Sequence, residues 1–195
     1  MTGHVPVLHP EDAVAARRNL LLGVQLGILS EIMLFGALFA AYFVIRGGSP
    51  AWPPSGGVDR PELLLPGLNT LLLVSSSVTM QLGVRSAATG KRGMLLRWLA
   101  LTLVLGGVFI GIQAYEFATN GFGLSDGVFG STFYTLTGFH GAHVLVGLTL
   151  IVIVVNRARL GRIGADRHTA VEAVSYYWHF VDVVWLFLFS TLYVL

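Results

Sequence analysis

Five long apolar runs constrain the fold of this chain more than any other feature of its sequence. They cover approximately residues 19–45, 63–84, 94–118, 129–156 and 172–195. Each is at or beyond the about 20 residues that a membrane-spanning helix needs. The chain is 54% hydrophobic and only 11% charged, whereas soluble domains carry roughly 25% charged residues. We therefore predict an all-α integral membrane protein, in which residues 1–195 form a single domain, a five-helix bundle.

The basic residues divide unequally between the two sides of the membrane. The outer side carries only Arg46 and Arg60, and the other ten are Arg17, Arg18, Arg85, Lys91, Arg92, Arg97, Arg157, Arg159, Arg162 and Arg167. Because basic residues favour the cytoplasmic side, we expect a cytoplasmic N-terminus and a C-terminus outside, on the periplasmic face. No basic patch is interleaved with aromatic residues, so nucleic acid is not an expected partner.

Glu31 is the most informative polar position in the first run. About 12 residues of helix from Asn19, at about 1.5 Å each, carry it roughly 18 Å inward, near mid-bilayer. An acidic residue at that depth is a functional-site hypothesis by default. The functional alternatives are a proton-relay group and a contact with lipid or a partner helix. The structural alternative is a hydrogen bond to a neighbouring helix of the bundle.

The last run contains an ionisable pair, His179 and Asp182, within the stretch YYWHFVDVVWLFLF. The two residues are three apart, so on a helix they share one face. Ionisable residues inside a membrane normally face a bundle interior or a water-filled path, where they find partners. We expect the pair to act together and to satisfy polar groups of a neighbouring subunit.

His140 and His143 are also three residues apart, a spacing that can chelate a metal or bond to a facing helix. Two histidines are an incomplete metal site, and the candidates to complete it are Glu31, Glu116, His179 and Asp182. No helix carries the Glu-x-x-His motif of carboxylate-rich di-metal bundles, so we predict no metal in this chain. Glu116, near the outer end of the third run, is expected to be an interfacial hydrogen-bonding residue.

Two other patterns are assigned to packing. Aromatic residues at helical spacing in the last run, including Trp178 and Trp185, are interpreted as core side chains. Glycines four residues apart let helix backbones approach closely, which predicts close contacts at Gly23 with Gly27 and at Gly107 with Gly111. The chain has no Cys, so disulfides, thiolate metal sites and cysteine nucleophiles are excluded.

The motifs together resemble subunit III of the haem-copper oxidases, most closely the cytochrome c oxidase branch. The similarity covers nearly the whole chain from about residue 19. Its pieces are SEIMLF at 30–35, WPP at 52–54, LNT at 68–70, QAYE at 113–116, SDGVFGSTFYTLTGFHGAHV at 125–144 and YYWHFVDVVWLFLF at 176–189. The last two are long and unusual, so the signal is strong.

This resemblance implies a subunit without a redox centre, in the inner (plasma) membrane of a prokaryote. Its implied partners are subunit I, which carries the haems and one copper and pumps protons, subunit II, and membrane lipids; a respiratory supercomplex is a further candidate. The family's third subunit holds phospholipid, steadies subunit I and supports proton uptake. Glu31 falls on the family's buried glutamate, and His143 and Arg157 fall on positions associated with lipid contact. The five runs resemble the last five helices of the seven-helix form, so part of its lipid cleft is missing here.

Three other functions remain open at the level of sequence. One is the equivalent subunit of a quinol oxidase or nitric oxide reductase. Another is a proton-coupled transporter with Glu31, His179 and Asp182 as a relay, although no inverted repeat or broken helix of the transporter kind is visible. The last is a metal-dependent membrane enzyme built on His140, His143 and His179.

Overall fold

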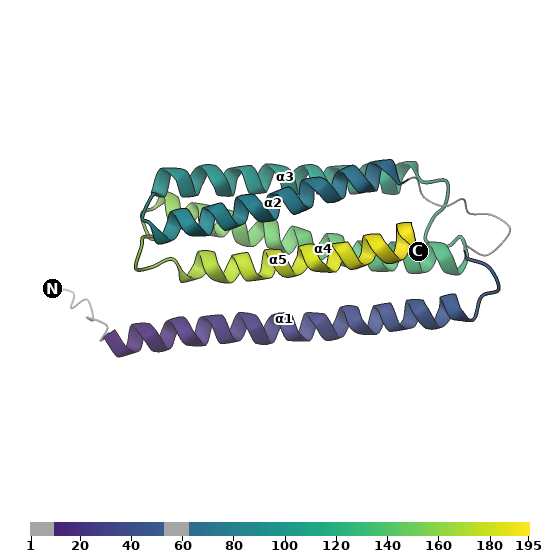
Figure 1. Ribbon diagram of the computed structural model, residues 1–195, viewed down its shortest axis with the longest axis horizontal. Helices are drawn as coiled ribbons and strands as arrows, with labels where there is room; N and C mark the ends of the chain where they lie inside the picture. Colours follow the sequence, from purple (N-terminus) through teal and green to yellow (C-terminus); the bar gives the residue numbers. More distant parts are fainter. Residues whose placement is uncertain (1–9, 53–62) are drawn as a thin grey trace, which may run out of the picture.

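The computed structural model describes residues 10–52 and 63–195, and its regular elements there are all helical (Figure 1). The elements are α1 (Pro10–Gly47), α2 (Leu64–Ala88), α3 (Arg92–Thr119), α4 (Gly127–Arg159), α5 (Thr169–Phe189) and a terminal π-helical turn, η1 (Ser190–Val194). Five helices in these ranges are long and apolar enough to cross a membrane. The predicted all-α architecture is therefore confirmed, and the five long apolar helices are consistent with the five predicted spans.

The helices extend beyond the predicted apolar runs. α1 begins at Pro10 rather than near residue 19, and α4 continues to Arg159 rather than 156. An apolar run marks the part of a helix that crosses hydrocarbon. Backbone hydrogen bonding continues into the polar flanks. The apolar runs therefore locate the helices but place the start of α1 and the end of α4 too far inside them.

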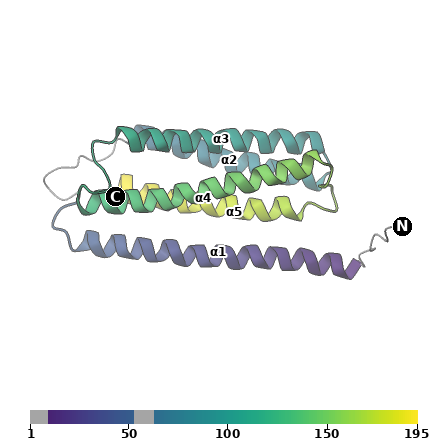
Figure 2. The same ribbon diagram turned by 180° about the vertical axis from the view of Figure 1, so that it is seen from behind.

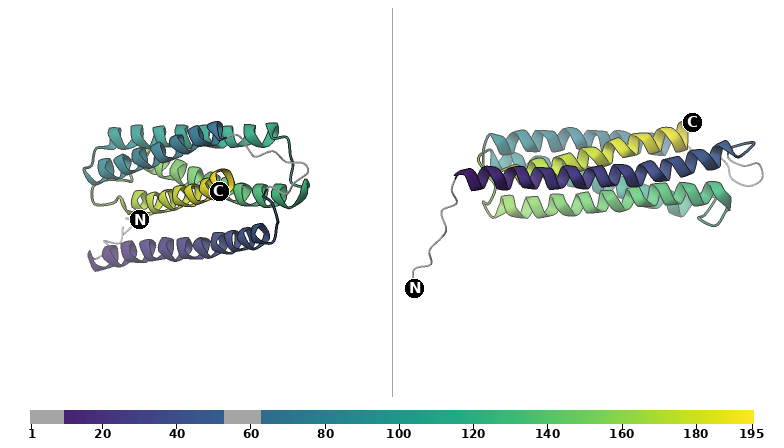
Figure 3. Two further views of the ribbon diagram at one scale, coloured as in Figure 1. Left: turned by 45° about the vertical axis from the view of Figure 1, so that its right-hand side comes forward. Right: turned by 90° about the horizontal axis from the view of Figure 1, so that it is seen from below.

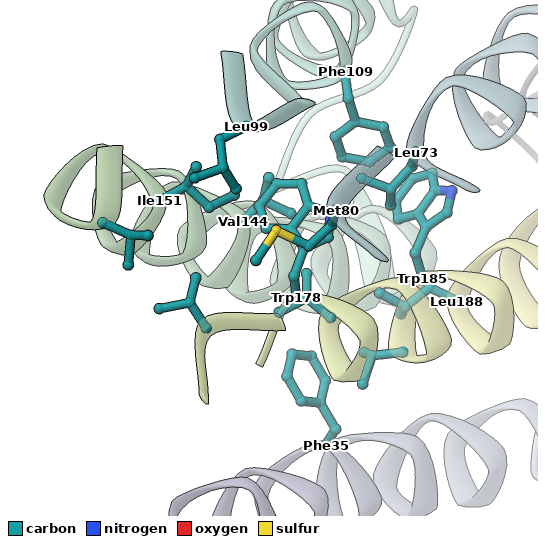
Figure 4. Close-up of a cluster of buried hydrophobic side chains, with 14 of the residues drawn as sticks. Phe35, Leu73, Met80, Leu99, Phe109, Val144, Ile151, Trp178, Trp185 and Leu188 are labelled. Carbon is teal, nitrogen blue, oxygen red and sulfur yellow. The ribbon is translucent and has the colours of Figure 1, made fainter. Parts of the chain in front are cut away.

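Helices α2 to α5 pack together, and α1 lies along one side of them (Figures 1 and 2). The main contacts of α1 are with α5 and α4, and seen from below it runs over the line between these two helices (Figure 3). We call this contact the α1 seam. The core lies among the other four helices, and Phe35 reaches toward it from α1 (Figure 4).

The two connections between α2 and α3 and between α4 and α5 lie at one end of the bundle, which we call the basic end. Both α2 and α4 stop there at a glycine with positive φ, 68° at Gly90 and 72° at Gly161. The following amide bonds back into the helix in each case, from Lys91 to the Ser86 carbonyl and from Arg162 to the Arg157 carbonyl. This Schellman ending needs a residue that adopts the left-handed region without strain, as glycine does. The opposite end of the bundle is the distal end.

The close helix contacts occur at different glycines from those predicted. An added Cβ would meet nothing within 4 Å among the described residues at Gly23, Gly27, Gly107 or Gly111, so these glycines do not form close contacts within the described bundle. The close contacts are at Gly106 and Gly147, where an added Cβ would lie 2.8 Å from the indole of Trp178 in both cases. The two glycines make room for one large side chain between α3, α4 and α5.

Candidate functional site

The candidate residues named from the sequence fall mainly into three groups of polar contacts. One group lies along the α1 seam, a second joins α2 to α5, and a third lies at the distal end. Every candidate residue named from the sequence belongs to one of these groups, except His140.

The middle of the α1 seam is held by Glu31 and His143. The Nε2 atom of His143 lies 2.9 Å from a carboxylate oxygen of Glu31, and its Nδ1 lies 2.6 Å from the backbone carbonyl of Phe139. A carbonyl can only accept, so Nδ1 carries a proton. A hydrogen bond between Nε2 and Glu31 needs one further proton, which lies either on Nε2 or on the carboxyl group. The pair is then either an imidazolium with a carboxylate or two neutral groups, and its net charge is zero in both cases. Such a pair is far less costly inside a membrane than either ion alone.

An apolar pocket of about 340 Å³ lies between Glu31 and the basic end of the seam. Helices α1, α4 and α5 all contribute to its wall, which also includes Arg157 and Tyr177. From Leu20 to Glu31 the α1 wall extends roughly 16 Å along the helix axis. The Tyr177 hydroxyl donates to the His143 backbone carbonyl at 3.2 Å. The pocket is therefore a long apolar groove with the cationic Arg157 toward one end and the partly exposed acid Glu31 at the other.

Two further polar contacts hold the ends of α1. At the basic end, Glu172 accepts from Arg17 at 3.0 Å and lies 3.1 Å from His168. At the distal end, the buried Tyr42 hydroxyl donates to the Thr191 backbone carbonyl at 2.9 Å. The seam is thus fastened by polar contacts at three levels, with apolar surface between them.

The second polar group joins α5 to α2 through Ser77. The Ser77 hydroxyl hydrogen bonds to Asp182 and lies 2.8 Å from Nδ1 of His179. On its other side, His179 Nε2 lies 3.4 Å from the side-chain oxygen of Gln81. The expected shared face of His179 and Asp182 is present, since both reach the same hydroxyl. Glu31 lies against α4 instead, so these three residues do not form the continuous relay that the transport hypothesis requires.

Glu116 and Tyr193 form the polar contact of α3 with the distal end of the chain. The Tyr193 hydroxyl donates to Glu116 at 2.9 Å, and both residues are buried. Glu116 therefore makes the hydrogen bond expected of it, to a partner inside the bundle.

The two histidines of α4 have different surroundings. His140 is fully buried between the rings of Phe109 and Trp185, and neither of its nitrogens has a partner among the described residues. His143 contacts α1 instead. Within the described ranges, no three His, Asp or Glu side chains converge in a way that could hold a metal ion. The spacing of the two histidines therefore does not produce the chelating pair that the sequence left open.

Sequence reasoning missed Ser77, Gln81 and Tyr42 as members of these groups. A usable signal existed for the first two, because they are polar, four residues apart and on one face of α2, a span of comparatively low hydropathy. Tyr42 carries no such signal, since a tyrosine near the end of a span is common at membrane interfaces.

Comparison with known proteins identifies the family of this chain. The family model of cytochrome c oxidase subunit III matches residues 6–195. The chain belongs to the cytochrome c oxidase subunit III family. It is 46% identical over 176 residues to cytochrome c oxidase subunit 3 of Thermostichus vulcanus, covering 89% of this chain and 86% of that protein. The corresponding protein of Synechocystis sp. is 43% identical, with 90% and 75% covered, and that of Danio rerio is 40% identical, with 91% and 70% covered.

The geometry around Glu31 predicts how this subunit III chain responds to substitution there. Glu31→Gln should be well tolerated, because an amide can still donate to His143 Nε2. Glu31→Leu should destabilise the protein by about 0.6–2 kcal/mol, the scale measured for intramembrane hydrogen bonds. Unfolding of the purified protein in detergent measures the difference. Gln25→Leu, on an exposed face of the same helix, is the control and should have little effect. Loss of electron transfer in an assembled Glu31→Gln complex would contradict an accessory role.

Proposed function

We propose that this chain is the non-redox accessory subunit III of a proton-pumping terminal oxidase that takes electrons from cytochrome c. It stabilises subunit I, holds phospholipid and supports proton uptake by the complex. The relatives are each named as subunit 3 of cytochrome c oxidase, which favours cytochrome c over quinol as the donor. Haem and copper belong to the partner subunits I and II in this proposal, and the chain contributes no catalytic residue.

The pocket of the α1 seam is the observation that carries the lipid-binding part of the proposal. Its wall is almost entirely apolar and is formed by three helices, as an acyl chain requires. Arg157 lies in the last turn of α4, where the proposal puts the phosphate of the phospholipid headgroup. An Arg guanidinium is well suited to a phosphate because it donates several hydrogen bonds and keeps its charge. The acidic Glu31 is already paired with His143, so it does not repel the lipid as a free ion.

The proposed location is the inner membrane of a prokaryote, with the basic end of the bundle in the cytoplasm. Arg92, Arg157 and Arg159 lie at this end in the structure. An odd number of spans places the beginning of α1 and the end of α5 on opposite sides, consistent with their positions in Figure 1. Anionic headgroups of the cytoplasmic leaflet would attract these basic residues and so favour this orientation.

Purification through an affinity tag on this chain tests the proposal. The complex should contain the haem-bearing subunit I and the copper-bearing subunit II, identified by optical spectra, metal analysis and mass spectrometry. Arg157→Leu should lower the amount of phospholipid per haem, whereas Arg159→Leu, on the same helix but outside the pocket wall, should not. The subunit assignment would be refuted if the purified chain carried no haem while the oxidase in the same membranes remained intact. Equal lipid contents in the two variants would refute the lipid site.

A further inference from the structure

We propose that the face of α2 and α5 around Gln81 is a polar docking site for a membrane-spanning helix of another oxidase subunit, which supplies a hydrogen-bond acceptor. This inference rests on the proposed function and extends it by naming the contact face and the chemistry of the partner. The face consists of Val74, Val78 and Gln81 on α2 with His179 and Val183 on α5.

The position of Gln81 along α2 sets its depth in the membrane. Gln81 is exposed on α2, and about seven residues of helix, or roughly 10 Å, separate it from the end of α2 at Ala88. The 25 residues of α2 span about 37 Å, whereas the hydrocarbon core is about 30 Å thick. Gln81 therefore lies several ångströms inside the hydrocarbon, where lipid chains offer no hydrogen-bonding group. A primary amide left unpaired there is costly.

The hydrogen bonds among His179, Ser77 and Asp182 determine which end of the Gln81 amide, its oxygen or its NH₂ group, is free. The contact of His179 Nε2 with the Gln81 oxygen requires a proton on Nε2, because the oxygen can only accept. Two proton arrangements then satisfy the contacts of Ser77. In one, neutral Asp182 donates to Ser77 and Ser77 donates to His179 Nδ1; in the other, charged His179 donates to Ser77 and Ser77 donates to the Asp182 carboxylate.

Both arrangements leave the same group at the surface. They differ by one proton moved between Asp182 and His179 through Ser77, and in each the side-chain oxygen of Gln81 accepts from His179. The amide NH₂ of Gln81 has no partner among the described residues. The outward end of the network is therefore a donor, and its partner must present an acceptor, such as a hydroxyl, a side-chain carbonyl or a free backbone carbonyl.

The surroundings of Gln81 suit a helix rather than a headgroup. Val74 and Val78 lie at the preceding turns of the same face and are 40% and 59% exposed, and Val183, one turn after His179, is 52% exposed. Short branched side chains around a polar centre leave room for a second helix to approach. Interhelical hydrogen bonds of polar side chains are a recognised means of holding such helices together in a membrane.

Photo-crosslinking in the assembled complex locates the contact. A photoreactive residue at Val78 should crosslink to one oxidase subunit, identified by mass spectrometry. Val104 on α3 is 60% exposed and serves as the matched control, from which we expect a lower yield. Crosslinks from Val78 to lipid alone, or equal protein yields at the two positions, would overturn the proposal.

Substitution of the donor tests the chemistry. Gln81→Leu should weaken retention of the chain by the rest of the oxidase about 3- to 30-fold in a detergent titration, the effect of one intramembrane hydrogen bond. If Gln81 faced lipid, leucine would leave retention unchanged or improve it, and that result would refute the site. Ser77→Ala should also weaken retention, whereas Ser75→Ala should not, because the Ser75 hydroxyl bonds within its own helix to the Leu71 carbonyl. A wild-type chain that never associates with an oxidase would instead refute the proposed function.

Discussion

Trp178→Ala is expected to lower the free energy of unfolding by about 3–5 kcal/mol, the usual cost of removing a large buried aromatic side chain. The indole has no exposed surface, and its Nε1 donates to the Ser76 hydroxyl at 2.9 Å. Its ring fills the space that Gly106 and Gly147 leave open. The remaining helices cannot close this space fully, so the variant should retain a cavity. Unfolding in mixed detergent micelles, followed by circular dichroism, measures the change.

The glycines provide the matched control for this prediction. Gly147→Ala adds a methyl group against the indole and should cost about 1–3 kcal/mol through overpacking. Gly107→Ala meets no atom and should be neutral or stabilising by up to about 1 kcal/mol, the difference in helix propensity. Combining Gly147→Ala with Trp178→Phe should cost less than the sum of the single changes, because both act on the same space. Full additivity would show that Gly147 and Trp178 are not coupled.

His179→Leu and Asp182→Leu should each lower the amount of this chain recovered with subunit I, and the double variant should be little worse than either. Both residues depend on the Ser77 hydroxyl, so the loss of one already breaks the chain of hydrogen bonds. A buried polar group left unsatisfied costs about 1–3 kcal/mol. Subunit ratios in the purified complex, measured together with haem spectra, give the result.

Two further observations distinguish this structural role from a role in redox chemistry. Asp182→Asn should be tolerated, because an amide can still donate to Ser77, and haem spectra should be unchanged in all the variants. A spectral change with full retention of the subunit would contradict the accessory role and favour a metal or haem contact. Losses that add fully in the double variant would contradict the common dependence on Ser77.

The sequence allowed the helices to be predicted because their signals are local. Run length identified five spans, and the spacing of three placed His179 and Asp182 on one face, since both depend only on helical geometry. Glu31 was correctly placed deep within a span for the same reason. None of these inferences depends on which helices pack against each other.

The contacts between helices could not be predicted in the same way. His143 is 112 residues from its partner Glu31, and no periodicity reveals how far each helix is rotated about its axis. The same rotation decides that Gly106 faces the core while Gly107 does not, and that His140 and His143 meet different helices. A glycine pair or a histidine pair identifies a face of a helix, but tertiary packing determines what that face meets.

Because α1 has few buried side chains, we expect its separation from the other four helices to cost less free energy than unfolding of the whole protein. Phe35 and Tyr42 are the buried core side chains of α1, Leu38 and Phe39 pack against the core at its edge, and polar contacts at three levels add to the hold of α1 on α4 and α5. Regions with little buried apolar surface open locally at a lower free energy than the whole protein unfolds. α1 can therefore separate from the four-helix core in a partial opening, and during biogenesis the core can become compact before α1 settles against it. Lipid seated in the α1 seam would act on this opening specifically, since it binds the closed form and shifts the equilibrium by mass action.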